Sequence, residues 1–588
     1  MHLVTSRFRP GAKSNDKLLF AGHWCLNIEE FNSLNKGNLI YPSHWEDQIN
    51  IYNDLPFLYK IYEELLPLVS NELNKIHNSN LNTRQWKIII GLWLFDFIRF
   101  FYDCFVTVKD IEKSGLVQTS YVSDGIEKIV SQNNEDLHKL YSEPEYLYLI
   151  YSFLIKRSNL NYEIVNIEHY FDSYAKSRVR IAFSVKRFIK SIFSILYSLP
   201  LLKKFKKIIF VASYFSREDL SKINANLRQL NMQYFFDPKP KSKAPSASLR
   251  KKINLKKNCE SEFEKLLLEI LPLQIPISTL ENFKKYNFYS KVFFPSNVES
   301  IFTANSYYYN DTFNFFVARE ISNGAKLLIA QHGAFGESLW STELDHMIDI
   351  SDFFYSWGWR HKNVKVIPMP SNKLSYTNRL IKQKNNANRL LFVLNSDIVN
   401  YMHSQCPQIR GSEFVTYIDE IKVITDALSS LNYEVKLRLY HTNYGRRTFE
   451  LKNHLIQAGY EKNIDKTKYF YDAVSESKLV VSTYHPNATG METISANIPT
   501  LFYWNKKQIK YRNKKIDSLY KKLLDIGVLH HSKESLLSHI AKIFPNVDKW
   551  WNSYEVRNTI EEYKEEFLLT DTNFIDIWSN ELKKHIKL

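Results

Sequence analysis

The segment of the sequence with the clearest chemistry joins an apolar strand to a helix at residues 482–492, STYHPNATGME. Free backbone N–H groups and the dipole at the start of that helix, near Thr489 or Gly490, can hold a phosphate. Glu492 falls in the first turn, where its carboxylate can accept hydrogen bonds from both hydroxyls of a ribose. If this segment is a nucleotide site, donor binding falls to Ser482, Thr483, Asn487, Thr489, Gly490 and Glu492. The alternative to a nucleotide site is an ordinary capped helix with an acidic first turn.

Two more polar loops follow expected strands. In QHGAFG, residues 331–336, His332 can donate to a phosphate or carboxylate or act as an acid–base group, and the glycines allow close backbone approach. Ligands of parallel sheets bind beside such loops, at the carboxyl ends of strands. RLYHTNYGRR, residues 438–447, offers cations to a nucleotide phosphate. A buried, satisfied histidine and solvated arginines are the respective alternatives. These loops add Gln331, Gly333, Arg438 and His441 to the donor-binding set, and His332 to the catalytic set.

Polar groups beside tryptophan mark the N-terminal region, in GHWC at 22–25 and HWED at 44–47. Aromatic faces suit stacking against sugars. Asp96 and Asp103 are acids seven residues apart on an otherwise apolar helix, and buried carboxylates need partners or have raised pKa values. An ion-paired core residue, with Arg99 as partner, is the open alternative for Asp96. We expect acceptor binding by His23, Trp24 and Trp45, and a base or nucleophile at Asp47 or Asp96.

Alternating strands and helices must position these loops. The alternation occurs twice, before about residue 375 and after about residue 388, and predicts parallel sheets with helices on both faces. The expected fold class is α/β, with two Rossmann-like lobes facing across a cleft and extra helices in the first lobe. Residues 1–375 would form the acceptor lobe, 376–545 the nucleotide lobe, and 546–588 helices that pack back on the first lobe. Further expected elements are a helix over 54–76 broken or kinked at Pro67, a buried helix over 84–107, and a strand over 291–297.

Composition sets the remaining limits. The 588 residues are 44% hydrophobic and 24% charged, which argues against a disordered chain, a collagen-like chain or a small disulfide scaffold. The four cysteines form no CxxC pair, so a metal knuckle or disulfide framework is not expected, and the compartment should be reducing. The N-terminal residues lack the apolar core of a secretory signal, and no run of about 20 uncharged apolar residues could span a bilayer.

The formal net charge of +16 suits an anionic partner. It concentrates in an amphipathic stretch at 176–207 and a Lys-, Pro- and Ser-rich stretch at 237–257, which we expect to be an exposed, mobile basic loop. Together they favour a cytoplasmic protein, bound peripherally to the inner face of the cytoplasmic membrane through anionic lipid. A core-packed helix with solvated lysines is the alternative for 176–207.

The motifs LFAGHWCL, YPSHWED, NTRQWKIIIGLWLFDFIRFFYD, LIAQHGAFGES, SDFFYSWGW and VVSTYHPNATGMETISANIPTLFYWN, in this order, identify a resemblance. The chain resembles the transferase family of bacterial O-antigen and surface-polysaccharide gene clusters. Its C-terminal half is more distantly similar to capsule Kdo transferases and CDP-glycerol-type transferases, which have the GT-B fold. The spacing of seven from Glu492 to Pro499 matches their nucleotide-sugar helix, with Asn497 in place of Gly. The His-Pro motif of the Kdo enzymes reads His441-Thr442 here.

The resemblance implies a glycosyltransferase that moves a Kdo-like or nonulosonic acid from a CMP-linked donor to a lipid-linked or polysaccharide acceptor. It implies no cofactor and no metal, because GT-B enzymes stabilise the leaving phosphate with helix ends and basic groups. Inversion and retention both stay open. An alditol-phosphate transferase of the CDP-glycerol type, a nucleic-acid-binding protein and a non-catalytic export scaffold are the alternatives, and nucleic acid is not the expected partner because no binding module is recognised.

Overall fold

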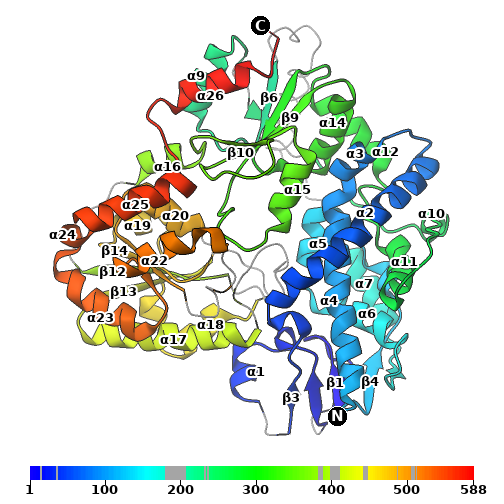
Figure 1. Cartoon of the computed structure of the whole chain (residues 1–588). Helices are drawn as coiled ribbons and strands as arrows, with labels where there is room; N and C mark the ends of the chain where they lie inside the picture. The colour runs from blue at the N-terminus through cyan, green and yellow to red at the C-terminus, as the bar shows by residue number, and fades with distance from the viewer. Residues whose placement is uncertain are drawn as a thin grey trace.

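The computed structural model describes residues 1–13, 16–34, 37–178, 207–230, 233–234, 238–381, 388–396, 409, 411–440, 448–485, 488–504, 510 and 513–587. In these residues three parallel sheets, each flanked by helices, form three lobes around the centre of the molecule (Figure 1). The predicted α/β class with Rossmann-like lobes is confirmed. The stretch 1–375, expected to be one lobe, contains two of the three sheets.

The N-terminal sheet has the order β3-β2-β1-β4-β5. The sequence analysis did not anticipate it as a sheet, because its strands have only two to four residues. A long helical layer covers it: α2 (Ile49–His77) continues through Pro67 without the expected break. The strands are β1 (His2–Val4), β2 (Leu18–Phe20), β3 (Leu39–Ile40), β4 (Thr119–Val122) and β5 (Glu163–Ile164).

The buried helix expected over 84–107 is present. It begins as α3 (Thr83–Trp86), capped by Asn82, passes through a π-helical turn at Lys87–Gly91, and continues as α4 (Leu92–Ser114). The π turn and the first residues of α4 pack against the core of the middle lobe, so this helix joins the first two lobes.

The middle sheet has the order β11-β10-β9-β8-β6-β7. Residues 291–297 are not a strand as expected: α12 (Phe283–Phe293) occupies the first part, and Phe283, Tyr286 and Ser290 form its buried stripe at helical spacing. The strand lies a few residues later, at β8. The strands are β6 (Ile208–Val211), β7 (Gln233–Tyr234), β8 (Ser300–Thr303), β9 (Lys326–Ala330), β10 (Phe353–Ser356) and β11 (Val366–Pro368).

The C-terminal sheet has the order β13-β12-β14-β15-β16 and matches the expected second series of strands. Its helices include α17 (Gly411–Ser430), α18 (Leu451–Gln457), α19 (Phe470–Ser475), α20 (Ala488–Ser495) and α22 (Asp517–Asp525). The strands are β12 (Arg389–Val393), β13 (Glu434–Arg438), β14 (Leu479–Ser482), β15 (Thr500–Tyr503) and β16 (Leu529–His530).

The C-terminal segment crosses between two lobes. Helix α25 (Tyr554–Phe567) packs on α20 and α22 of the C-terminal lobe, and α26 (Phe574–Lys583) packs on α9 (Arg217–Asn226) of the middle lobe (Figure 1). The buried Trp578 ring lies against Phe302 and Tyr355 of the middle sheet. The last helices therefore tie the second and third lobes together.

Ion pairs and hydrogen bonds connect every pair of lobes. Lys87 Nζ lies 2.6 Å from Asp349 Oδ2, between the N-terminal and middle lobes. Ser412 Oγ donates to Glu46 Oε1 at 2.5 Å, between the C-terminal and N-terminal lobes. The third connection, between the middle and C-terminal lobes, lies in the candidate site described below.

The basic segment from residue 238 to 257 is anchored at Arg250. It contains the short helix α10 (Ala247–Arg250), and the buried Arg250 guanidinium donates to both carboxylate oxygens of Glu281 at 2.9 Å. Its backbone is therefore held against the N-terminal lobe. Residues 179–206 of the expected amphipathic stretch lie outside the described residues.

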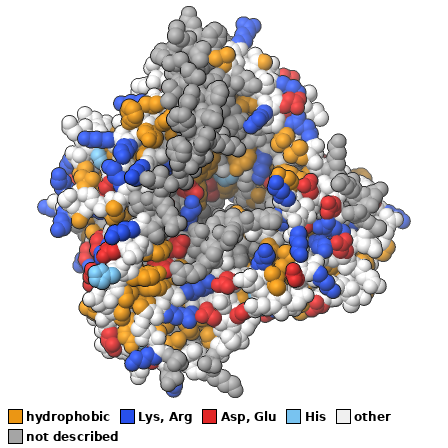
Figure 2. All heavy atoms as spheres, turned by 180° about the vertical axis from the view of Figure 1, so that it is seen from behind, with side chains coloured by type: hydrophobic (Ala, Val, Ile, Leu, Met, Phe, Trp, Pro, Cys, Tyr) orange, Lys and Arg blue, Asp and Glu red, His pale blue; other side chains and the backbone are white. Residues whose placement is uncertain are grey.

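No helix in the described ranges is long and apolar enough to cross a bilayer. On the face shown in Figure 2, the described lysine and arginine side chains lie interspersed with acidic ones.

Candidate functional site

The strand order of the middle sheet reverses between β6 and β8: β7 is added on one side of β6, and β8 to β11 are added on the other. Ligands of open parallel sheets bind at such a point, outside the carboxyl ends of the strands. Tyr214 follows β6 and Asn305 follows β8, and Asn305 Nδ2 donates to the Tyr214 hydroxyl at 2.9 Å. Ala212 and Tyr214 have φ values of +46° and +61°. Such left-handed, non-glycine residues are strained and concentrate at functional sites.

His332 follows β9, the next strand along. Its ring stacks on the Tyr214 ring with centroids 6.2 Å apart, and its Nε2 lies 3.7 Å from Glu343 Oε1. Burial, followed by the positive charge of Lys373, lowers the pKa of His332 to about 3. The imidazole is therefore neutral near pH 7, and it can donate one hydrogen bond but cannot serve as a cation or as an effective base.

Glu343 is a site residue that the sequence analysis missed. It lies in the first turn of α15 (Thr342–Ile350), which Ser341 caps, and the Tyr307 hydroxyl donates to its Oε1 at 2.7 Å. Burial raises the pKa of this carboxyl group to about 7, against the opposing effect of the tyrosine hydrogen bond. A general acid or base works best when its pKa is close to the working pH. The signal in the sequence was a helix start capped by Ser341, five residues after the end of the QHGAFG loop.

Glu492 joins the two sheets. Its carboxylate forms an ion pair with Lys373 Nζ at 2.6 Å and accepts a hydrogen bond from the Tyr471 hydroxyl at 3.1 Å. Lys373 follows β11 of the middle sheet and begins α16 (Leu374–Leu380), which packs against α20. Its ammonium also lies 5.8 Å from the centre of the Tyr214 ring. His332, Tyr214, Lys373 and Glu492 thus form a continuous polar connection between the carboxyl ends of both sheets; neither Lys373 nor Tyr214 was predicted.

The predicted hydroxyls in the C-terminal lobe are structural in this conformation. Thr483 is fully buried; its Oγ1 donates to the Val393 carbonyl at 2.8 Å and lies 2.6 Å from the Tyr417 hydroxyl. Ser482 is also fully buried. A Cβ on Gly490 would come within 2.9 Å of Ser482 Oγ, so this glycine lets α20 approach β14 closely. Thr489 lies in the first turn of α20, at the expected helix start, but Glu492 lies in the second turn and not in the first as expected.

Two predicted donor-binding side chains point into the protein. Gln331 is fully buried, and its Oε1 accepts hydrogen bonds from the Trp357 N–H and from Trp359 Nε1, both at 2.8 Å. Arg438 pairs with Asp465 at 2.6 Å. Both side chains therefore shape strand ends rather than touch a ligand. Gly333 has ordinary space around it, whereas Gly336 has a φ of +94° and lies close to Trp359. His441 and Asn487 lie outside the described residues.

The N-terminal aspartates do not support the catalytic role predicted for them. Asp96 is fully buried, paired with Arg99 on one carboxylate oxygen and with His138 Nε2 at 3.0 Å on the other. The ion-paired alternative is the one that the structure shows, because no oxygen of this carboxylate is open to a substrate. Asp47 is about half-exposed and binds Lys510 at 3.0 Å, so it links the first and third lobes at the surface.

The predicted acceptor-binding aromatic residues are packed. Trp45 is 1% exposed, and its Nε1 donates to Asp54 at 2.8 Å; Trp24 donates to the Thr5 carbonyl and stacks on Tyr151. The Trp45 ring therefore offers no open face to a sugar, whereas the Trp24 ring is only partly buried. His23 is buried 3.6 Å from Glu46, at the contact with α17. His23 thus lies at a lobe interface, whereas both tryptophans pack within the N-terminal lobe. The sequence could not distinguish these roles from stacking on a ligand.

A second buried polar cluster attaches the QHG loop to the C-terminal lobe. The Tyr563 hydroxyl donates to Glu337 Oε1 at 2.5 Å, and the Asn513 N–H donates to the Glu337 carbonyl at 2.7 Å. Burial raises the pKa of Glu337 to about 7 although Tyr563 and Tyr520 both lower it. Tyr520 also contacts His485 Nε2 at 3.0 Å, in the loop after β14. No group of three His, Cys, Asp or Glu side chains suited to a metal ion occurs within the described part of the chain.

The sequence matches one family model almost from end to end. The model describes the LIC12162 family transferases and covers residues 1–582. The chain belongs to the LIC12162 transferase family. Membership accounts for the collinear motifs, which run through all three lobes, and it makes the protein a transferase.

Other comparisons add little. No curated protein matches this LIC12162 family member. Among solved structures, Acinetobacter baumannii MurG aligns with 64% of this chain and 99% of its own, at 13% identity and a TM-score of 0.29. A Listeria monocytogenes protein assigned as a UDP-N-acetylglucosamine 2-epimerase aligns with 65% of this chain and 96% of its own, at 10% identity and a TM-score of 0.34. Both TM-scores are below 0.5.

Proposed function

We propose that this LIC12162 family member is a glycosyltransferase whose nucleotide-linked donor binds between the middle and C-terminal sheets. The observation that carries the proposal is the Lys373–Glu492 ion pair, which bridges segments following the carboxyl ends of two parallel sheets. A donor in this position would have its phosphate near the start of α20 and the Lys373 ammonium. Glu492 retains acceptor capacity for ribose hydroxyls, since a carboxylate can accept about four hydrogen bonds.

The proposed chemistry is displacement at the anomeric carbon. Glu343 accepts the proton of the acceptor hydroxyl, the hydroxyl oxygen bonds to the anomeric carbon, and the sugar–phosphate bond breaks with its electrons retained by the nucleotide. Lys373 balances the charge that develops on the leaving phosphate. Neutral His332 donates a hydrogen bond to the donor without adding charge. This assigns the base to Glu343, in place of Asp47 and Asp96.

The finer identity of the substrates is also a proposal. A cation and a neutral hydrogen-bond donor side by side suit a donor sugar that carries its own carboxylate, such as a CMP-linked Kdo-like or nonulosonic acid. The acceptor would be a glycan of bacterial surface polysaccharide, O-antigen or capsule, reached at the inner face of the cytoplasmic membrane. We propose that donor binding needs no metal, because Lys373 and a helix end can balance the phosphate charge.

A thermal-shift screen with CMP, CDP, UDP, GDP and ADP tests the site, because a ligand that binds the folded state raises the melting temperature. We expect the cytidine nucleotides to stabilise the protein, with and without EDTA. Glu492→Ala should weaken binding by about 1.5–3 kcal/mol, the value of a charged hydrogen bond. Glu434→Ala, on an exposed carboxylate of the same lobe, is the matched control.

Unchanged nucleotide binding by Glu492→Ala would refute the assigned site. Strict dependence on Mg²⁺ would refute metal-free binding. Mass spectrometry of the glycan product tests the reaction: the proposal requires a mass gain equal to a sugar, whereas a gain that includes phosphate would identify an alditol-phosphate transferase.

A further inference from the structure

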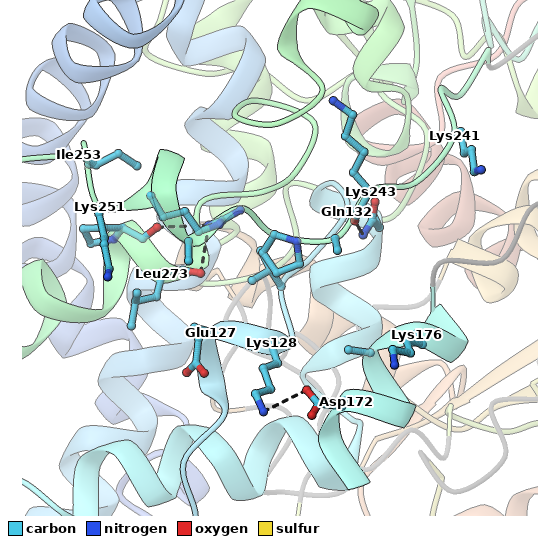
Figure 3. A pocket seen from close by; sticks show the side chains of 17 residues that line it. Glu127, Lys128, Gln132, Asp172, Lys176, Lys241, Lys243, Lys251, Ile253 and Leu273 are labelled. Carbon is cyan, nitrogen blue, oxygen red and sulfur yellow. Dashed lines mark hydrogen bonds and ion pairs between the residues drawn. The ribbon is translucent and has the colours of Figure 1, made fainter. Parts of the chain in front are cut away.

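A pocket of about 900 Å³ lies in the N-terminal lobe (Figure 3), and neither Lys373 nor Glu492 lines it. This volume is near the upper end for small-molecule sites, roughly 300–1,000 Å³. Its walls come from residues 127–132, from α7 (Glu168–Arg178), from residues 241–253 and from the end of α11 (Glu262–Gln274). The anchored basic segment, although many of its side chains are exposed, thus forms one side of a cavity.

The inner walls of this pocket are apolar. Val130 and Ile253 are 4% and 7% exposed and belong to the protein interior, and Pro272 and Leu273 lie beside them. Ala175, Ala244, Pro245 and Ala247 complete a lining without any aromatic side chain. Such walls suit a flexible hydrocarbon, and they offer nothing on which a nucleotide base or a sugar ring could stack.

Lysines surround this apolar space. Figure 3 shows Lys128 and Lys176 on one side and Lys241, Lys243 and Lys251 on the other. Lys128 is neutralised by Asp172 at 3.0 Å. Lys176, Lys241 and Lys251 are exposed and form no ion pair among the described residues. Lys243 donates to the Glu281 carbonyl and so keeps its charge. Cations therefore outnumber the two lining acids, Glu127 and Asp172.

We propose that this pocket binds a lipid phosphate, with the hydrocarbon chain against the apolar walls and the phosphate among the unpaired lysines. A free phosphate would contact the lysines but not the apolar walls. A neutral lipid would contact the apolar walls but not the lysines. The anchoring of Arg250 by Glu281 keeps the wall in place without a ligand. The proposal does not depend on the transferase chemistry assigned above.

Calorimetry on the full chain with dodecyl phosphate, below its micelle-forming concentration, tests the proposal. Inorganic phosphate is the control for the headgroup alone, and dodecyltrimethylammonium is the control for the same chain with the opposite charge. Each should bind at least about tenfold more weakly than dodecyl phosphate. Ala247→Trp places a bulky side chain in the pocket from an exposed position, and Lys241→Glu/Lys251→Glu reverses the charge at the rim. Each should weaken dodecyl phosphate binding on the order of tenfold or more.

Lys252→Glu is the matched control, because Lys252 is an exposed neighbour of Lys251 that does not line the pocket. The affinity of the Lys252→Glu variant for dodecyl phosphate should stay within about twofold of that of the unsubstituted protein. An equal loss in Lys252→Glu would mean that general surface charge attracts the ligand, and would overturn the proposal. So would equal binding of the cationic amphiphile, or flotation with anionic vesicles by a protein that does not bind dodecyl phosphate. If Ala247→Trp does not fold, the charge-reversal variant carries the test.

Discussion

Glu337 offers the sharpest test of the contact between the middle and C-terminal lobes. Its pKa is raised from 4.5 to about 7, chiefly by burial, while its hydrogen-bond partners, Tyr563 and Tyr520, both belong to the C-terminal lobe. In the unfolded chain the carboxyl ionises near pH 4.5, whereas in the folded protein it holds its proton to about pH 7. The folded state therefore binds more protons between these values, and stability falls as the pH rises through this window.

The size of the effect follows from the shift. Each pKa unit corresponds to about 1.4 kcal/mol. Ionisation of Glu337 should therefore lower the free energy of unfolding by on the order of 2–3 kcal/mol between pH 5 and pH 8. Glu337→Gln keeps an acceptor for Tyr563 but cannot ionise, so this part of the pH dependence should disappear. The melting temperature of the original protein should therefore fall more between pH 5 and pH 8 than that of the variant. For a cooperative unit of about 200 residues, the difference between the two falls should be on the order of 5 °C.

Differential scanning fluorimetry at both pH values measures the change. Glu566→Gln, an exposed carboxylate on α25, is the control and should keep the original pH dependence. A melting-temperature profile for Glu337→Gln parallel to that of the original protein would refute the reasoning, because Glu337 would then titrate alike in the folded and unfolded states.

Three further predictions concern catalysis and the C-terminal segment. Glu343→Gln should lower turnover by about two to four orders of magnitude and abolish the rise in kcat/KM through about pH 7, as measured in a pH–rate series; a retained rise would exclude Glu343 as the base. His332→Asn should keep more activity than His332→Ala, which should lose about two orders of magnitude, because the imidazole acts as a neutral donor; equal, near-normal turnover in both would leave His332 purely structural. Trp578→Ala should destabilise the middle lobe by about 3–5 kcal/mol, as followed by calorimetry, whereas Tyr554→Ala, on an 80% exposed side chain, should not; similar melting curves would contradict the packing role of α26.

The sequence predicted the polar loops after β9, β13 and β14, because apolar runs bounded by turn and helix-start signals precede them. In the middle sheet it placed a strand at 291–297, where α12 lies, and missed β8. It placed His332 and Glu492 beside the meeting point of the two sheets. It did not predict the N-terminal sheet, since strands of two to four residues leave no periodicity to detect. Nor could it pair Lys373 with Glu492 across more than a hundred residues, because only tertiary packing brings α16 beside α20.

Burial was the second limit on the sequence analysis. Asp96, Trp45 and Gln331 have the residue types of a binding site, and their spacing gave no means to tell whether their polar atoms were already used. Glu343 shows the converse, because a carboxylate in the first turn of a helix acquires a pKa suited to acid–base chemistry only when a tertiary fold removes it from water.

The contacts between all three pairs of lobes limit how the protein can move. Two lobes joined by one linker can rotate apart about a hinge, but here any rotation of one lobe strains both of its interfaces, whether at Lys87, Glu46 or Lys373. The C-terminal helices add a second covalent crossing between the middle and C-terminal lobes. Among the described residues, the three lobes and their contacts form a closed ring, which leaves no lobe free to rotate about a single hinge. Substrate entry and product exit would then depend on rearrangement of side chains and loops at the strand ends. If a nucleotide binds at the proposed site, breaking the Lys373–Glu492 pair would be the local step that admits it.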